Sequence, residues 1–255
     1  MILITGASGY IGSHITKKLV TEGKSVRALI RNPDRAKNEG RLQDLNVEWF
    51  AGDINHPESL QSAMQGAQVV IHTVAIAIEK GGRTYEGINY QGTVNVVEAA
   101  KKTGVRRFIN LSQLGANSKL PYRLLASKGL AQEYVSGSGL DWTSFRPSVV
   151  WGPEDEFANT FARLALLTPL IFPIVGDVNS KFQPVWVEDV ATCLVKALDD
   201  PGTAGKEYEL GGPEVLTLEE IERRTLQAIG ARRKMIRFPM AFLRIAVTLM
   251  EALLP

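Results

Sequence analysis

Three glycines near the amino terminus constrain this chain more than any other feature. They lie in the run Thr5-Gly6-Ala7-Ser8-Gly9-Tyr10-Ile11-Gly12, directly after the apolar residues 2–5 and at the start of an amphipathic helical pattern. In that context Gly6 permits a tight turn, Gly9 lets the backbone approach a pyrophosphate, and Gly12 lets the helix pack close to a strand. The free amides at the helix start attract phosphate oxygens. The run therefore predicts a dinucleotide-binding turn; the alternative is a purely structural turn between strand and helix.

The first half of the 255-residue chain alternates short apolar runs with amphipathic stretches. Such alternation with short connections predicts parallel strands joined by right-handed crossovers. We expect an α/β fold with a doubly wound, Rossmann-type parallel sheet, whose six strands occupy residues 2–5, 26–30, 47–51, 69–73, 108–111 and 142–145.

The alternation becomes irregular after residue 147. We expect a nucleotide-binding body over residues 1–150 and a small C-terminal substrate lobe over residues 151–255, which completes the cleft and returns some elements to the body. Thr217 and Glu220 have the spacing of a capping box, which predicts where a helix begins. The expected elements of this half are helices at 189–198 and 218–229 and a strand at 207–210.

The end of the second expected strand indicates which dinucleotide binds. An acidic residue there would hydrogen-bond the ribose 2′-hydroxyl of NAD and repel a 2′-phosphate. Ile30 stands at that position, Arg31 follows it, and Arg35 lies close behind. A guanidinium pairs well with a phosphate dianion, so the sequence favours NADP(H) over NAD. The alternative is that Arg31 is a solvated surface charge.

Overall charge and histidine placement exclude other classes of partner. The formal net charge is +2, from 29 basic and 27 acidic residues, which gives no argument for nucleic acid. His14, His56 and His72 are scattered without the spacing of metal ligands, so we expect no metal site. His72 ends an apolar strand, and we expect it to be a hydrogen-bonded structural histidine near the cofactor.

Met1 leads directly into the first strand, which favours a cytoplasmic protein.

The chain resembles the extended and atypical short-chain dehydrogenase/reductases over nearly its whole length. More narrowly, residues 152–157 and 176–191 resemble the branch that contains the NAD(P)H-binding accessory subunit of respiratory complex I. The wider resemblance rests on residues 5–12, 52–53, 71–75, 89–95, 111–112, 127–128 and 146–152. Strand-end position and this resemblance together give the expected cofactor-binding residues: Gly6, Ser8, Gly9, Tyr10, Ile11, Gly12, Arg31, Arg35, Asp53, Ile54, Thr73, Val74, Ala75, Asn89, Lys128 and Pro147.

The resemblance also implies a catalytic set, which this chain only partly carries. Active members use a serine, a tyrosine as general acid or base, and, four residues after the tyrosine, a lysine that lowers the phenol pKa. Ser112 and Lys128 match the serine and the lysine, but Leu124 occupies the tyrosine position. A phenol with a pKa near 10 needs a nearby cation to act as a general acid or base at neutral pH. The side chain of leucine has no ionisable proton and cannot take this role. Tyr122, six residues before Lys128, is the nearest alternative phenol.

Two apolar segments in the second half indicate hydrophobic contacts. Residues 157–175 are apolar for a segment that should roof a substrate cleft, which favours packing on the body, a quinone- or lipid-like ligand, or a partner protein. Residues 239–255 carry only Arg244 and Glu251 as charges. Seventeen such residues are short for a membrane span, so we expect burial, or docking on a membrane-protein complex at the inner face of a membrane.

Three functions fit these features. The first is a protein that holds NADP(H) with little or no tyrosine-dependent catalysis, similar to the complex I accessory subunit. The second is an active NADP-dependent oxidoreductase or epimerase acting on a quinone-, lipid- or sugar-like substrate. The third is a redox-sensing regulator similar to the NmrA-type proteins. The sequence leaves open whether the chain is an enzyme.

Overall fold

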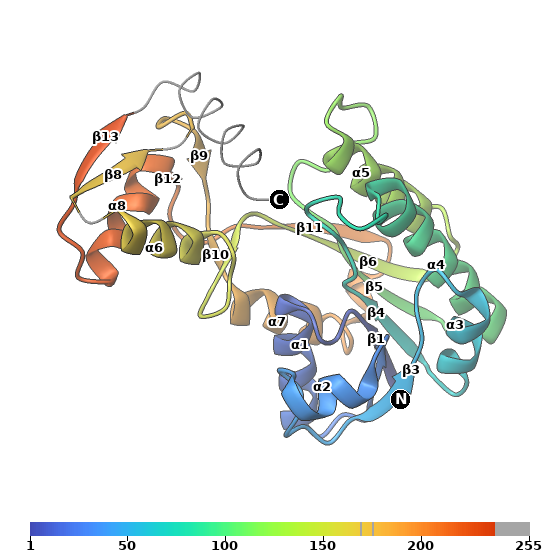
Figure 1. Ribbon diagram of the computed structural model, residues 1–255. Coiled ribbons are helices and arrows are strands. Elements are labelled where there is room, and N and C mark those ends of the chain that lie inside the picture. The colour runs from blue at the N-terminus through green and yellow to red at the C-terminus, as the bar shows by residue number, and fades with distance from the viewer. Residues whose placement is uncertain (169, 175, 238–255) are drawn as a thin grey trace. The chain divides into compact units, whose positions relative to one another are not determined.

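The largest sheet among the described residues is a seven-stranded parallel sheet (Figure 1). The computed structural model describes residues 1–168, 170–174 and 176–237. The strand order of this sheet is β11-β6-β5-β4-β1-β2-β3, and every neighbouring pair is parallel. This confirms the expected doubly wound Rossmann architecture. The strands span Ile2–Thr5 (β1), Val26–Ile30 (β2), Glu48–Ala51 (β3), Val69–His72 (β4), Arg107–Leu111 (β5), Asp141–Pro147 (β6) and Lys206–Leu210 (β11).

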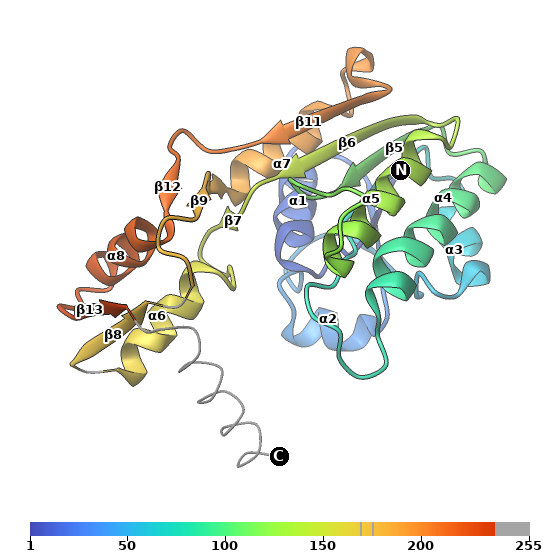
Figure 2. The same cartoon turned by 90° about the horizontal axis from the view of Figure 1, so that it is seen from above.

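Helices cover both faces of this sheet. Figure 2 shows α1 (Tyr10–Thr21) and α7 (Val187–Lys196) on one face, and α3 (Pro57–Met64), α4 (Gly92–Thr103) and α5 (Arg123–Ser136) on the other. Three short helices lie in the connections: α2 (Pro33–Glu39), a π-helical turn (Glu86–Gln91) and a 3-10 turn (Pro201–Thr203). Because both faces are covered, the central strands are buried throughout, as the four buried residues of β1 show.

The strand order places a switch in direction between β1 and β4. The chain runs outward from β1 through β2 to β3, then crosses back and continues outward through β4, β5 and β6. The connection that follows β1 therefore leads to α1 on one face of the sheet, and the connection that follows β4 leads to α4 on the other. A crevice at the carboxyl ends of the strands opens at such a point, and ligands of doubly wound sheets bind there.

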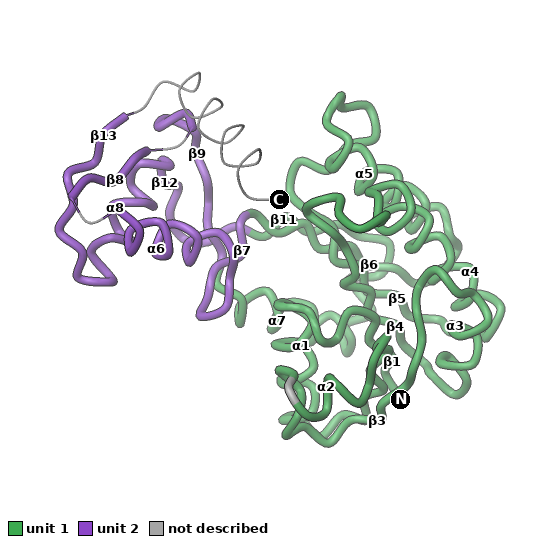
Figure 3. The backbone as a smooth tube through the Cα atoms, in the orientation of Figure 1, with its two compact units in different colours: residues 1–148, 186–210 green, residues 149–185, 211–255 purple. Residues whose placement is uncertain are grey.

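The chain divides into two compact units (Figure 3). The first contains residues 1–148 and 186–210, and the second contains residues 149–185 and 211–255. The expected strand at 207–210 is β11, which pairs in parallel with β6 at the edge of the main sheet. The expected helix at 189–198 is α7, which also belongs to the first unit.

The second unit is built from two helices and short strands. Phe172 and Leu226 lie in its core, between α6 (Ala158–Leu167) and α8 (Leu218–Ala228). Thr217 and Glu220 form the expected capping box at the start of α8. The strands are β7 (Val150–Trp151), β8 (Ile171–Ile174), β9 (Lys181–Phe182), β10 (Val185–Trp186), β12 (Leu216–Thr217) and β13 (Lys234–Arg237), of which β8 pairs with β13 and β9 with β12.

Two further expectations concern the membrane and metal ions. The docking segment expected at 239–255 lies outside the described residues. Within the part of the chain that the structure describes, no helix is long and apolar enough to cross a bilayer. The same residues contain no group of three histidine, cysteine or carboxylate side chains placed to hold a metal ion.

Candidate functional site

The glycine-rich turn has a backbone that other residues would not fit. Gly6 has a φ of +81°, in the left-handed region that favours glycine, and its carbonyl accepts a hydrogen bond of 2.9 Å from the Gly9 amide. A Cβ at Gly12 would lie 2.1 Å from the Gly6 carbonyl oxygen. A Cβ at Gly6 would lie 2.6 Å from Thr73 Oγ1, so the loops after β1 and β4 touch here. Close packing therefore fixes the start of α1 against the strand ends.

A cavity of about 310 Å³ opens at the carboxyl ends of β1 to β4. It lies within the first unit, at the switch in strand direction. Nine expected cofactor-binding residues line it: Gly6, Ser8, Gly9, Arg31, Asp53, Ile54, Thr73, Val74 and Ala75. The remaining lining residues are Leu29, Ile30, Gly52, Asn55, Ile76, Arg83 and Ile88. The structure therefore brings together the glycine turn, the end of β2 and the loops after β3 and β4.

Other expected cofactor residues do not line this cavity. Gly12 is buried against the turn, and Tyr10 and Ile11 begin α1. The Arg35 backbone amide donates to Asn32 Oδ1 and so caps α2. Pro147 is buried at the end of β6.

Two guanidinium groups border the cavity, and the sequence pointed to only one of them. Arg31 follows β2, is exposed and lines the cavity beside Ile30. Arg83 also lines it, from the long loop after β4. No periodicity or motif marks Arg83 in the sequence, because an irregular loop of that length has no fixed direction. The carboxylate of Asp53 accepts the Asn55 amide at 2.9 Å and so shapes the loop after β3.

Asn89 forms hydrogen bonds with the loop after β4, which lines part of the cavity. Its Oδ1 accepts the Ile76 amide at 2.8 Å, and its Nδ2 donates to the Ile76 carbonyl at 3.2 Å. Nδ2 also lies 3.3 Å from Ser127 Oγ on α5. Asn89 was expected to contact the cofactor; in the structure it is buried and fixes the backbone of a residue that lines the cavity.

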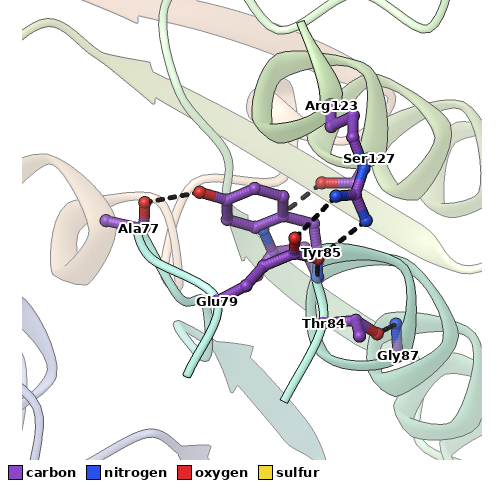
Figure 4. Close-up of polar contacts among 8 residues, drawn as sticks. Ala77, Glu79, Thr84, Tyr85, Gly87, Arg123 and Ser127 are labelled. Atoms are coloured by element: carbon purple, nitrogen blue, oxygen red, sulfur yellow. Dashed lines mark hydrogen bonds and ion pairs between the residues drawn. The ribbon is translucent and has the colours of Figure 1, made fainter. Parts of the chain in front are cut away.

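Farther along, the same loop is tied to the start of α5 (Figure 4). Both Glu79 carboxylate oxygens accept hydrogen bonds from the Arg123 guanidinium, at 2.7 and 2.9 Å. The guanidinium carbon lies 5.9 Å from the centre of the Tyr85 ring, and the Tyr85 hydroxyl donates to the Ala77 carbonyl at 2.8 Å. A bidentate ion pair stacked on an aromatic ring restrains both partners. The loop between β4 and the π-helical turn is therefore braced at both ends.

A second, much smaller cavity of about 10 Å³ lies farther along the sheet. Ser112, Lys128, Asn89, Asn110 and His72 are among its lining residues. The Ser112 side chain is 6% exposed, and its Oγ has no hydrogen-bond partner among the described residues. Buried hydroxyls are nearly always paired, so the unpaired Ser112 hydroxyl is an exception that needs an explanation. The structure thus brings the expected serine and lysine to one pocket.

Burial governs the electrostatics of this second cavity. It lowers the pKa of Lys128 to about 8. Burial, followed by the charge of Lys128, lowers the pKa of His72 to about 3, so His72 is neutral at physiological pH. His72 bonds at both ring nitrogens, to Thr5 Oγ1 and Thr93 Oγ1. The prediction of a hydrogen-bonded structural histidine is confirmed.

The two residues that bear on proton transfer lie at the start of α5. Leu124 is partly buried in the first turn of the helix, four residues before Lys128. Tyr122 is the residue that precedes the first turn of α5, and it is 66% exposed. It lines neither cavity described above. The tyrosine position of the catalytic set is therefore filled by an aliphatic side chain.

Comparisons with known proteins agree with this arrangement. A family profile described as NAD(P)H-binding matches residues 6–201. Subunit 9 of the NADH dehydrogenase [ubiquinone] 1 alpha subcomplex of Arabidopsis thaliana is 31% identical over 92% of this chain, which spans 60% of that protein's length. Ceramide reductase of Caulobacter vibrioides is 29% identical over 94% of the chain and 74% of its own length.

Solved structures share the fold. UDP-glucose 4-epimerase of Thermotoga maritima superposes with a TM-score of 0.77 at 21% identity, covering 93% of this chain and 85% of that one. The NAD complex of UDP-glucose 4-epimerase from Thermus thermophilus gives 0.74 at 24% identity, over 92% and 85%. The chain therefore belongs to the NAD(P)H-binding family, as an atypical short-chain dehydrogenase/reductase related to accessory subunits of respiratory complex I.

Proposed function

We propose that this protein holds NADP(H) and performs little or no tyrosine-dependent catalysis. The observation that carries the proposal is the composition of the larger cavity. Its glycine turn has no room for a Cβ at Gly6 or Gly12. Two guanidinium groups border the cavity, that of Arg31 after strand β2, which ends without an acidic residue, and that of Arg83 from the loop after β4. That combination suits a pyrophosphate at the helix start and a third phosphoryl group beside Arg31.

The residues present fit the parts of such a cofactor. The amides at the start of α1 would bind the pyrophosphate, and Arg31, with Arg83 in the same lining, would bind the 2′-phosphate. Asp53 and Ile54 would contact the adenine. Lys128 would donate to the ribose that carries the nicotinamide, which is the group that supplies hydride when bound. A cavity of about 310 Å³ is within the usual range for small-molecule sites.

Leu124 is the reason for proposing that the protein binds NADP(H) without tyrosine-dependent catalysis. Proton transfer in the family depends on a phenol four residues before the lysine, on the same helix face. Leu124 occupies that place, so Lys128 retains its ribose-binding role without a phenol to activate. The relatives named as subunits of NADH dehydrogenase support a structural role in a larger assembly.

A second function is favoured by the unpartnered Ser112 hydroxyl. Together with Lys128, whose pKa is lowered to about 8, it could hold a carbonyl oxygen and supply a proton directly. The chain would then be an oxidoreductase, and the relative named ceramide reductase favours a lipid-like substrate over a sugar. The variant Lys128→Ala would abolish turnover of NADPH with such a substrate.

The same relatives support a proposal for the partner and the location. We propose a cytoplasmic protein that works at the inner face of a membrane beside a membrane-protein complex. Residues 239–255, which lie outside the described part of the chain, would supply the contact to that complex.

Native mass spectrometry of the purified full chain tests the proposal. We expect one NADP⁺ or NADPH per chain, retained under gentle ionisation and released on denaturation. Folded protein that carries no dinucleotide, and gains none when NADPH is added, would overturn it. A chain that retains NAD⁺ instead would leave dinucleotide binding in place and refute the role of Arg31.

A further inference from the structure

Four aliphatic side chains stand exposed at one end of the second unit. Leu166, Leu167, Leu170 and Ile171 lie where α6 ends and β8 begins, and they are 78%, 79%, 82% and 39% exposed. We call these four residues the leucine patch. Their neighbours Ala165 and Phe172 are 1% and 0% exposed, so the segment packs its other face into the core of the unit. Clustered exposed leucines of this kind mark an interaction site.

Basic residues surround the leucine patch. Arg163 precedes Leu167 by one helical turn on α6, and the two share a helix face. Lys234 on β13 pairs in register with Ile171 on β8, and Arg233 Nε donates to the Thr168 carbonyl at 3.1 Å. Arg232 precedes them. Figures 1 and 2 show β13 beside β8 at this end of the unit.

These basic side chains lack the carboxylate partners that others in the unit have. Arg224 pairs with Glu214 at 2.8 Å, Arg237 with Glu219 at 2.9 Å, and Arg223 also lies 3.5 Å from Glu219. Within the described residues, Arg163, Arg232, Arg233 and Lys234 form no ion pair. The rim of the leucine patch therefore carries uncompensated positive charge, although the chain as a whole is nearly neutral.

We propose that the leucine patch and its basic rim dock on the surface of an anionic lipid bilayer. The aliphatic side chains would enter the boundary between headgroups and acyl chains, and the basic side chains would bind acidic headgroups. The inference goes beyond nucleotide binding and does not rest on it, because the patch belongs to the second unit and the nucleotide cavity to the first.

Two other occupants fit less well. A second copy of the chain, docked patch to patch about a two-fold axis, would place like charges against each other. Residues 238–255 carry one acidic side chain, Glu251, and one basic side chain, Arg244, so this segment would not compensate the charge of the rim. An anionic bilayer satisfies both the apolar residues and the charge.

A fluorescent label on the patch tests which occupant is present. The full chain would carry Cys193→Ser, which removes its one cysteine, and Leu167→Cys labelled with an environment-sensitive dye. We expect a blue shift with vesicles of equimolar phosphatidylglycerol and phosphatidylcholine, and none with phosphatidylcholine alone. The same label at Ile78, which is 75% exposed in the first unit, should not shift.

Three results would overturn the proposal. The first is the absence of any shift with anionic vesicles. The second is a dye that is already blue-shifted in buffer and unaffected by vesicles, which would mean that the chain covers its own patch. The third is a shift that depends on protein concentration without vesicles, which would indicate a second copy.

Vesicle cosedimentation of variants tests the two components separately. The double variant Leu166→Glu/Leu167→Glu should lower the vesicle partition coefficient at least tenfold, whereas Ile78→Glu should not change it. The variant Arg232→Gln/Lys234→Gln should lower it by roughly twenty-five-fold, since each basic residue contributes about fivefold, and added salt should abolish that difference. Lys119→Gln/Lys206→Gln, which alters two exposed lysines of the first unit, is the matched control. A circular dichroism spectrum and a cooperative thermal transition that match those of the parent would show that each variant is folded.

Discussion

The imidazole of His72 donates its Nε2 proton to the hydroxyl oxygen of Thr93, 3.0 Å away. The direction is fixed because the Thr93 hydroxyl proton is already donated to the Asn89 carbonyl at 2.8 Å. The Nδ1 atom of His72 then accepts from Thr5 Oγ1 at 2.7 Å. This chain of bonds joins the ends of β1 and β4 to α4 and the π-helical turn, and it requires a neutral imidazole.

The buried imidazole should make stability depend on pH. Its pKa is about 3 in the folded chain against 6.5 ordinarily, so the unfolded chain binds one more proton between these values. The free energy of unfolding should therefore fall by about 1.4 kcal/mol per pH unit as the pH drops from 6.5 towards 3. Urea unfolding as a function of pH measures this. The variant His72→Asn should lack that contribution; identical pH slopes for the two proteins would contradict the assignment.

Replacing the partly buried lysine should stabilise the chain and weaken its cofactor site. Lys128 has a pKa of about 8 in the folded chain against 10.5 ordinarily, so its charge opposes folding at neutral pH. The variant Lys128→Met should raise the free energy of unfolding at pH 7 by roughly 2–3 kcal/mol, and the gain should shrink as the pH rises from 8 to 10.5. Its affinity for NADPH should fall. A variant less stable than the parent at pH 7 would show that Lys128 has a structural role.

A methyl group in the glycine turn should block the nucleotide while the fold persists. A Cβ at Gly9 would lie 3.1 Å from the Gly6 carbonyl oxygen, a contact that a small shift relieves. The variant Gly9→Ala should lose at least tenfold in NADPH affinity, for a stability cost of about 1 kcal/mol. At Gly137 the nearest atom would be 3.5 Å away, so Gly137→Ala is the control. Equal dinucleotide affinities of the two variants would refute the proposed pyrophosphate site.

Restoring a phenol on α5 should restore chemistry. The variant Leu124→Tyr places a hydroxyl four residues before Lys128, whose ammonium would lower the phenol pKa. General acid catalysis contributes about a hundredfold or more, so NADPH oxidation with small aromatic aldehydes should rise by that order. Leu124→Phe matches its shape without the proton and should stay at the background rate. If Leu124→Tyr binds NADPH and remains at background, Leu124 is not what limits catalysis.

Local patterns sufficed to predict the nucleotide-binding half. The glycine turn, the end of β2 and the residues after β3 and β4 came together as expected, because the carboxyl ends of parallel strands must share one edge. The capping box at Thr217 could also be predicted from the sequence, because both of its hydrogen bonds join residues three apart.

Features that depend on contacts between residues far apart in the chain could not be predicted from the sequence. The pattern at 207–210 indicated a strand, but nothing local showed that β11 would extend the main sheet beside β6. Arg83 borders the cavity from an irregular loop, and its position follows from braces such as Glu79–Arg123 and Asn89–Ile76 that join separate elements. The exposure of Leu166 and Leu167 likewise depends on which face of α6 meets Phe172, whereas their sequence suggested a roof over the cleft.

Calorimetric titration of the nucleotide-free chain with NADPH and NADH tests the central claim most directly. We predict that NADPH binds at least tenfold more tightly than NADH. The variant Arg31→Gln should lower this preference and leave NADH affinity unchanged, because in the proposed arrangement Arg31, which lines the cavity, binds the 2′-phosphate that NADH lacks. The absence of heat with either dinucleotide, on protein shown to be folded, would contradict the account.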